Sequence, residues 1–136
     1  MDKLRHNHGL RPTEWNRLIE EVVMQGEYLV NQRKYGFDAV AQKSKDDGSP
    51  QTSCDTDVEA ALKRVLHSFG NGYAVISEEA PMEDNLLAIQ SDDYVWVMDP
   101  IDGTKTFIDG YDEYTINVAL MSPPSATPPH NRTPVM

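Results

Sequence analysis

Hydrophobic and polar positions follow two different periods along this chain, and the period changes near residue 72. From Thr13, apolar side chains recur every three or four positions with glutamates between them, which predicts a helix over residues 13–35. A second run with this spacing begins near Asp55 and closes at Gly70, and it predicts a second helix. Each helix has one apolar face to bury.

Three shorter segments follow the second helix and have the composition of strands. Residues 73–77, 94–98 and 114–121 are rich in β-branched and aromatic side chains. Two helices followed by three strands favour an α+β fold, with the two N-terminal helices packed on a mostly antiparallel sheet. Residues 43–52, between the helices, are polar and contain a glycine and a proline, so we expect a loop there.

Both ends of the chain differ from this pattern. Residues 1–12 carry His6, His8 and several charges, and we expect a flexible lead there. Residues 122–136 hold five of the nine prolines in the chain, and such a segment lacks the donors of a strand. We therefore expect one domain over residues 1–121, followed by a proline-rich disordered tail over 122–136.

The charge of the chain excludes several classes of partner. Twelve Lys and Arg face 22 Asp and Glu among 136 residues, giving a net charge of -10, which repels nucleic acids and anionic membranes. No segment approaches the length of apolar sequence that spans a bilayer, and we expect no membrane partner. The lone Cys54 cannot form an internal disulfide. With no export signal apparent, these features predict a cytoplasmic location.

Acidic residues follow two of the expected strands. Residues 73–77 lead into Glu78 and Glu79, and residues 94–98 lead into Asp99 and Asp102. Carboxylates that converge at strand ends repel one another unless cations lie between them, and hard cations such as Mg²⁺ prefer such oxygen ligands. A pair such as Glu78 and Glu79, taken alone, is more often a solvated turn.

The run Asp-Pro-Ile-Asp-Gly-Thr at residues 99–104 is harder to explain as a simple turn, since a turn needs no flanking aspartates. The i, i+3 spacing of Asp99 and Asp102 lets both side chains turn to one side, with the Ile101 carbonyl between them. Gly103 permits a backbone conformation closed to other residues, and Thr104 can cap a short helix whose free N–H groups face the same place. A cation site beside an anion site is what phosphoryl transfer requires.

Three runs together resemble the inositol monophosphatase superfamily: residues 76–79, residues 96–105 and residues 114–120. The branch they resemble most is that of the 3'(2'),5'-bisphosphate nucleotidases, which remove a phosphate from adenosine 3',5'-bisphosphate (PAP), because Lys105 directly follows the aspartate motif. The similarity runs from about residue 13 to residue 121, and residues 48–55 match the family's loop and helix start. It implies the N-terminal half of a sugar-phosphatase-like layered fold.

The resemblance also implies roles for individual residues. The expected Mg²⁺ ligands are Glu78, Asp99, the main-chain carbonyl of Ile101, and Asp102. Asp55 would hydrogen-bond Thr104, and the two would orient or deprotonate a water for in-line attack on phosphorus. Glu79 would act beside the metal ligands or on a further ion. The N–H groups of Gly103 and Thr104 would bind the phosphate.

The chain departs from the family after Met121. Family members continue into a second half that supplies another metal-binding aspartate in a Trp-Asp motif, whereas Trp15 and Trp96 are the only tryptophans here and neither precedes Asp. We therefore expect a truncated, impaired Mg²⁺-dependent phosphomonoesterase that removes the 3'-phosphate of PAP, a small phosphate ester, by means of a metal-activated water. Two alternatives stay open: an inositol or other sugar phosphatase, and an inactive truncated chain that only binds cations or a full-length partner. Self-association into a homo-oligomer also stays open.

Overall fold

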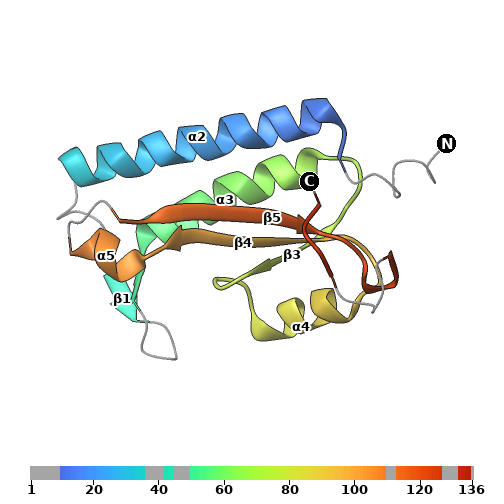
Figure 1. The fold of residues 1–136 in the computed structure, drawn as a ribbon. Helices are drawn as coiled ribbons and strands as arrows, with labels where there is room; N and C mark the ends of the chain where they lie inside the picture. Colours follow the sequence, from blue (N-terminus) through green and yellow to red (C-terminus); the bar gives the residue numbers. More distant parts are fainter. Residues whose placement is uncertain (1–9, 36–41, 45–49, 110–112, 127–131, 136) are drawn as a thin grey trace.

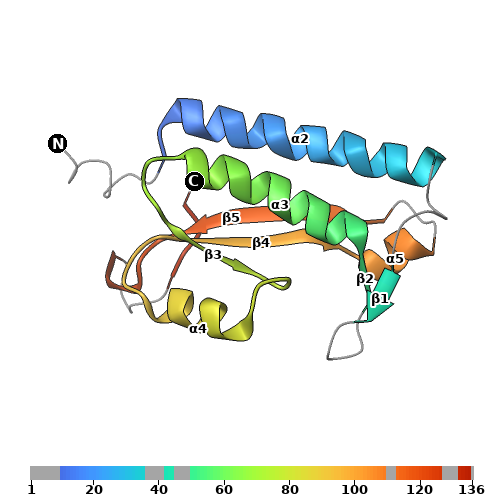
Figure 2. The same ribbon diagram turned by 180° about the vertical axis from the view of Figure 1, so that it is seen from behind.

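A computed structural model describes residues 10–35, 42–44, 50–109, 113–126 and 132–135. Two long helices cover one face of a three-stranded sheet, and a shorter helix lies on the other side (Figures 1 and 2). The expected α+β arrangement, with two N-terminal helices on a sheet, is confirmed. Among the described helices, none is long and apolar enough to cross a membrane.

The long helices are α2 (Pro12–Tyr35) and α3 (Ser53–Ser68), close to the bounds that their apolar spacing predicts. Proline suits the first position of α2 because it has no N–H to leave unpaired. Glu14 binds the residue that precedes this helix, since its Oε1 accepts hydrogen bonds from the backbone N (3.0 Å) and Nε (3.2 Å) of Arg11. Leu10, within the expected flexible lead, is buried, while residues 1–9 lie outside the described part.

The sheet has the strand order β3-β4-β5, with β3 spanning Ala74–Ser77, β4 spanning Val95–Asp102 and β5 spanning Thr115–Met121. β4 and β5 are antiparallel, and they form the longer ladder. β3 and β4 are parallel, which the sequence analysis did not predict. The central strand also continues into the aspartate motif, as far as Asp102, instead of ending before it.

Helix α4 (Met82–Gln90) makes this parallel pairing possible. Two parallel neighbours need a crossover connection, because the chain must return to the starting edge of the sheet. This helix was not predicted from the sequence, although Glu83 and Asp84 in its first turn are typical of a helix start.

The predicted loop at residues 43–52 is wrong in part. Backbone pairing joins β1 (Gln42–Ser44) to β2 (Pro50–Thr52) as an antiparallel pair, while residues 45–49 lie outside the described part. Two short helical segments complete the fold, α5 (Thr104–Ile108) and the 3₁₀ helix η2 (Pro124–Ala126).

The core lies between the sheet and the two long helices. The indole of Trp15 on α2 meets that of Trp96 on β4 edge to face, with centroids 6.0 Å apart. Trp96 is 1% exposed, so this contact fixes which face of β4 looks toward the helices. Side chains that alternate with Trp96 along β4, such as Val97 and Asp99, therefore face the other way.

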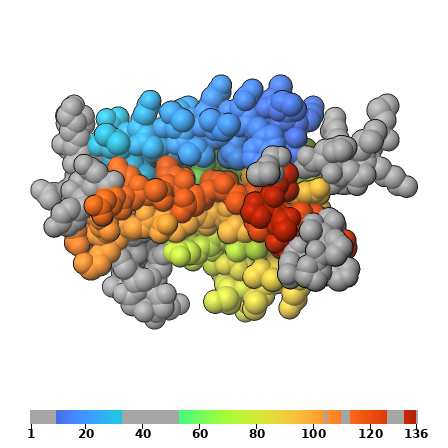
Figure 3. All heavy atoms as spheres, viewed as in Figure 1, coloured from blue at the N-terminus to red at the C-terminus, as the bar shows by residue number. Residues whose placement is uncertain are grey.

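The described part of the tail lies against the end of β5 (Figure 3, red). The N–H of Ser122 donates to the carbonyl of Thr133, and that of Val135 donates to the carbonyl of Leu120, each at 2.8 Å. These contacts differ from the disordered tail that the proline content predicts. Pro123 follows Ser122 and Pro134 precedes Val135, so neither of these two prolines occupies a position that donates an N–H.

Candidate metal and phosphate site

The aspartate motif contains a one-residue bulge. Asp99 pairs with Asn117 and Asp102 with Thr115, so three steps along β4 match two steps along β5. Residues i and i+3 of a regular strand point to opposite faces, whereas the extra residue brings Asp99 and Asp102 to the same face. Pro100 lies in the bulge, where a missing N–H removes no ladder hydrogen bond. The expectation that both aspartates turn to one side therefore agrees with this register.

A groove of about 540 Å³ opens on this face of the sheet, away from α2 and α3. Figure 3 shows the molecule hollowed beside α4. Glu78, from the turn after β3, and Asp99, from β4, both line it. Asp102 is linked to the groove through Asn117, whose Nδ2 donates to Asp102 Oδ2 at 3.1 Å.

The candidate metal ligands suit a hard cation, because the side chains of Glu78, Asp99 and Asp102 all offer carboxylate oxygens. The arrangement is not a closed ligand shell, however. Within the described residues, no three Asp, Glu, His or Cys side chains come close enough together to hold one ion. The structure thus brings Glu78 and Asp99 into one groove and Asp102 onto the same face, without gathering them around a single point.

The residues between the aspartates anchor the motif. The side chain of Ile101 is 1% exposed, so it holds the strand in the core while Asp102 stays at the surface. That its carbonyl is a metal ligand stays a prediction.

Gly103 adopts φ 94° and ψ 37° at the start of α5, a left-handed conformation that strongly favours glycine. A Cβ there would lie 2.9 Å from the Glu113 carbonyl oxygen, so the close approach of the two segments also requires glycine. Phe107 on α5 packs edge to face against Tyr114 at 5.0 Å and is fully buried. These contacts fix α5 to the beginning of β5.

Asp55 lies in the first turn of α3 and is only 1% exposed. The start of α3 lies at the same end of the molecule as α5, next to β2 (Figure 2). The side chain of Thr104 lies outside the described part, so the Asp55–Thr104 hydrogen bond stays a prediction. One turn further along α3, Glu59 forms an ion pair with Lys63 of the next turn, with Lys63 Nζ 2.7 Å from Glu59 Oε1.

Two tyrosines outside the groove have shifted pKa values. Burial raises the pKa of Tyr28, and the hydrogen bond of 2.8 Å that it donates to Asp57 Oδ2 raises it further. Burial, with the negative charge of Asp93 nearby, raises the pKa of Tyr73 to about 12. Both phenols therefore stay neutral at physiological pH.

Three polar residues beside the acidic ones were not predicted from the sequence: Asn117, which bonds the Asp102 side chain, Asn85, which bonds the backbone of Ser77, and Ser77, which accepts from the backbone N–H of Glu79. Asn117 interrupts an otherwise apolar strand, a signal that could have identified it. Asn85 lies in α4, which was not predicted, and no feature of the neighbouring sequence marks it as a functional residue.

Known proteins are similar to this chain in both sequence and fold. Residues 17–127 match the Inositol monophosphatase family. The bifunctional phosphatase IMPL2 of Arabidopsis thaliana is 36% identical over 96 residues, covering 71% of this chain and 26% of the plant protein. The 3'(2'),5'-bisphosphate nucleotidase CysQ of Escherichia coli K12 is 36% identical over 78 residues, covering 57% of this chain and 31% of CysQ.

A solved IMPase/NADP phosphatase, complexed with NADP and Ca²⁺, superimposes with a TM-score of 0.64 at 19% identity, over 84% of this chain and 42% of that one. This likeness shows the fold alone. The chain spans between 26% and 40% of the length of the first curated relatives that it matches. Because the family match covers most of the chain and includes the bulged aspartate motif, the chain belongs to the inositol monophosphatase family.

Proposed function

We propose that this chain forms the Mg²⁺-binding and phosphate-binding part of a phosphomonoesterase that removes the 3'-phosphate of PAP. The observation that carries this proposal is the bulge in β4, because it places Asp99 and Asp102 on one face beside the groove that Glu78 lines. The related fold complexed with Ca²⁺ supports a hard cation in this family.

The ligands proposed for Mg²⁺ are Glu78, Asp99, the Ile101 carbonyl and Asp102. Mg²⁺ bound there would neutralise phosphate oxygens and activate water as a nucleophile. Asp55, buried at the start of α3, would with Thr104 orient that water and accept its proton. Glu79 would support the ligands from the adjoining turn position.

The phosphate would be held by the N–H groups of Gly103 and Thr104. The first N–H groups of a helix have no partner within it, and the left-handed Gly103 turns the chain at this point. No covalent intermediate on the protein is needed.

PAP is proposed as the substrate on two grounds: the lysine that directly follows the aspartate motif, and the likeness to CysQ. Lys105 is well exposed, and its Nζ lies 2.9 Å from Asp109 Oδ2, so it can reach a second phosphate by exchanging a weak surface pair. The family as a whole favours inositol phosphates as the alternative. Phosphate release from PAP and from inositol 1-phosphate, measured side by side with the purified chain, distinguishes the two.

The metal site is tested by thermal unfolding with and without Mg²⁺. A ligand that binds only the folded state stabilises it, by about 2.7 kcal/mol at a hundredfold excess over Kd. We expect Asp99→Asn combined with Asp102→Asn to abolish the Mg²⁺-dependent rise in Tm. The matched control is Glu83→Gln with Asp84→Asn, which removes the same charge from the exposed start of α4 and should leave the rise intact. An unchanged rise in the aspartate double variant would contradict the ligand assignment.

Turnover by the isolated chain is expected to be slow. The proposed ligands Glu78, Asp99 and Asp102 would serve one ion and leave a second ion short of carboxylates, and the described residues show no group of three such side chains gathered at one point. Two-ion phosphoryl transfer clamps both the attacking and the leaving oxygen. Each missing group of this kind typically costs on the order of a hundredfold or more in rate. Two such losses multiplied make us expect hydrolysis at least about a thousandfold slower than by a family member that carries both halves. Turnover at ordinary rates, lost in Asp102→Ala, would show instead that this chain supplies a whole site, for example by self-association.

A further inference from the structure

The turn between β3 and α4 carries both glutamates of the site. The N–H of Ala80 donates to the carbonyl of Ser77 at 3.1 Å, which closes a four-residue turn. Glu78 and Glu79 are its two central residues. The direction in which Glu78 enters the groove therefore depends on how Ser77, the first residue of the turn, is held.

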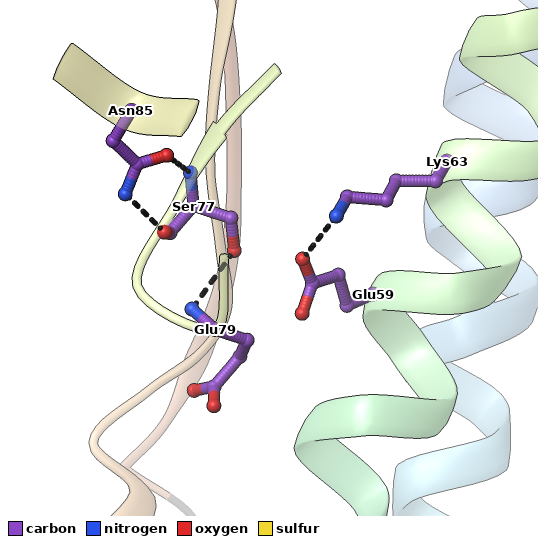
Figure 4. A network of polar contacts seen from close by, with 5 residues as sticks. All are labelled: Glu59, Lys63, Ser77, Glu79 and Asn85. Atoms are coloured by element: carbon purple, nitrogen blue, oxygen red, sulfur yellow. Dashed lines mark hydrogen bonds and ion pairs between the residues drawn. The ribbon is translucent and has the colours of Figure 1, made fainter. Parts of the chain in front are cut away.

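Ser77 is held by a side chain from α4. Asn85 Oδ1 accepts from the backbone N of Ser77 at 3.2 Å, and Asn85 Nδ2 donates to the carbonyl oxygen of Ser77 at 2.8 Å (Figure 4). The hydroxyl oxygen of Ser77 in turn accepts from the N–H of Glu79 at 3.3 Å. A single carboxamide thus binds both main-chain polar groups of the residue that precedes Glu78.

The position of β3 in the sheet explains this arrangement. Among the described strands, β3 pairs only with β4, so its other edge has no neighbouring strand. Ser77 is 2% exposed, and buried main-chain groups need hydrogen-bond partners. A carboxamide offers one donor and one acceptor side by side, as a neighbouring strand would. Two simultaneous hydrogen bonds also fix the orientations of the two peptide groups that flank Ser77, including the one that leads to Glu78, which one bond would not.

We propose that Asn85 is a positioning residue for the metal site: by clamping Ser77 it sets the direction in which Glu78 enters the groove. This inference rests on the proposed function, since it assumes that Glu78 is a metal ligand. Asn85 also lines the groove that Glu78 and Asp99 share. Residues that orient metal ligands typically change metal affinity 10–100-fold when they are replaced.

The test measures Mn²⁺ binding to the purified chain at a temperature where every variant is folded. The electron paramagnetic resonance signal of free Mn²⁺ reports how much of the ion stays unbound. Asn85→Leu keeps the approximate shape and removes both hydrogen bonds, and we expect it to raise Kd about tenfold. Gln90→Leu makes the same amide-to-leucine change at an exposed position of α4 and should stay within about twofold of the wild type. A purely structural role for Asn85 would lower the free energy of unfolding without changing the Kd of the folded protein.

Asn85→Asp provides the second variant, and it decides the question if Asn85→Leu does not fold. It keeps the acceptor for Ser77 N–H but places a carboxylate oxygen against the Ser77 carbonyl. The added negative charge by itself attracts cations, so a higher affinity would show that charge alone matters and would overturn the proposal. We expect a lower affinity.

Glu78→Gln separates failure of this inference from failure of the proposed function. If Glu78→Gln weakens Mn²⁺ binding and Asn85→Leu leaves it unchanged, Asn85 does not position the ligand, while the metal site stands. If the wild type and Glu78→Gln bind alike, or the wild type does not bind Mn²⁺, the assignment of Glu78 is wrong and the role of Asn85 is overturned with it.

Discussion

Asn117 on β5 donates a hydrogen bond of 3.1 Å from Nδ2 to Oδ2 of Asp102 across the bulge in β4. The second aspartate of the motif is therefore oriented by a residue fifteen positions further along the chain. Because Asn117 also lines the groove, the antiparallel pairing of β4 and β5 contributes directly to the candidate metal site.

Replacing Asn117 by leucine should weaken metal binding by roughly tenfold, since the carboxylate of Asp102 loses the bond that orients it. Thr115→Val is the matched control. Thr115 lies on β5, as Asn117 does, and is paired with Asp102 of β4, and the substitution preserves the shape of the side chain. Mn²⁺ titration of the folded variants measures both. Equal losses in the two variants would show that the strand surface as a whole, and not this hydrogen bond, matters.

Gly103→Ala should destabilise the chain by at least about 1–2 kcal/mol, the cost of a left-handed conformation for a residue with a Cβ. The close contact with the Glu113 carbonyl adds to this cost. Gly26→Ala provides the opposite case, since Gly26 lies within α2 with open space around it, and should stabilise by about 0.5–1 kcal/mol. Equilibrium unfolding in urea measures both, and changes of the same sign would contradict this reading.

Tyr73→Phe should be nearly neutral at pH 7 and stabilising above pH 10. The Tyr73 hydroxyl is buried without a hydrogen-bond partner, so its removal leaves no group unsatisfied. Since the pKa of Tyr73 is raised to about 12, the unfolded chain loses this proton near pH 10 while the folded chain keeps it. The wild type therefore loses stability between pH 10 and 12, and the variant lacks this contribution. Urea unfolding across this range gives the comparison, and parallel pH profiles would contradict the prediction.

Arg132→Ala should lower the free energy of unfolding by about 1.5–3 kcal/mol, the usual range for hydrogen bonds to a charged group. Its guanidinium donates to the carbonyl oxygens of Ala88, Ile89 and Ser91 at the end of α4, and to that of Ser122. A lysine has no planar fork and should not restore the loss.

Arg64→Ala, at an exposed position of α3, is the control for losing an arginine and should stay within about 0.5 kcal/mol. Unfolding of the three variants in urea measures the difference. Equal effects of Arg132→Ala and Arg64→Ala would show that the tail contributes nothing to stability.

Local patterns were sufficient to predict much of this protein. The spacing of apolar side chains predicted α2 and α3 because one face of each helix must be buried. Short β-branched runs predicted β3 and β5 nearly to their ends. The aspartate motif, with the runs around it, indicated the family through its resemblance, and the match over residues 17–127 confirms it. The cation site that the motif also suggested stays a prediction.

Tertiary structure decided what depends on pairing between distant segments. The parallel pairing of β3 with β4 requires α4 as a crossover, and no local period encodes which strands become neighbours. The bulge exists only in the register between β4 and β5, yet it determines that Asp99 and Asp102 share a face. Asn85 acts on Ser77 only because α4 returns along the open edge of β3. The chemical types of the candidate site residues could be predicted from the sequence. The direction of each side chain was set by strands and helices that meet only in the folded state.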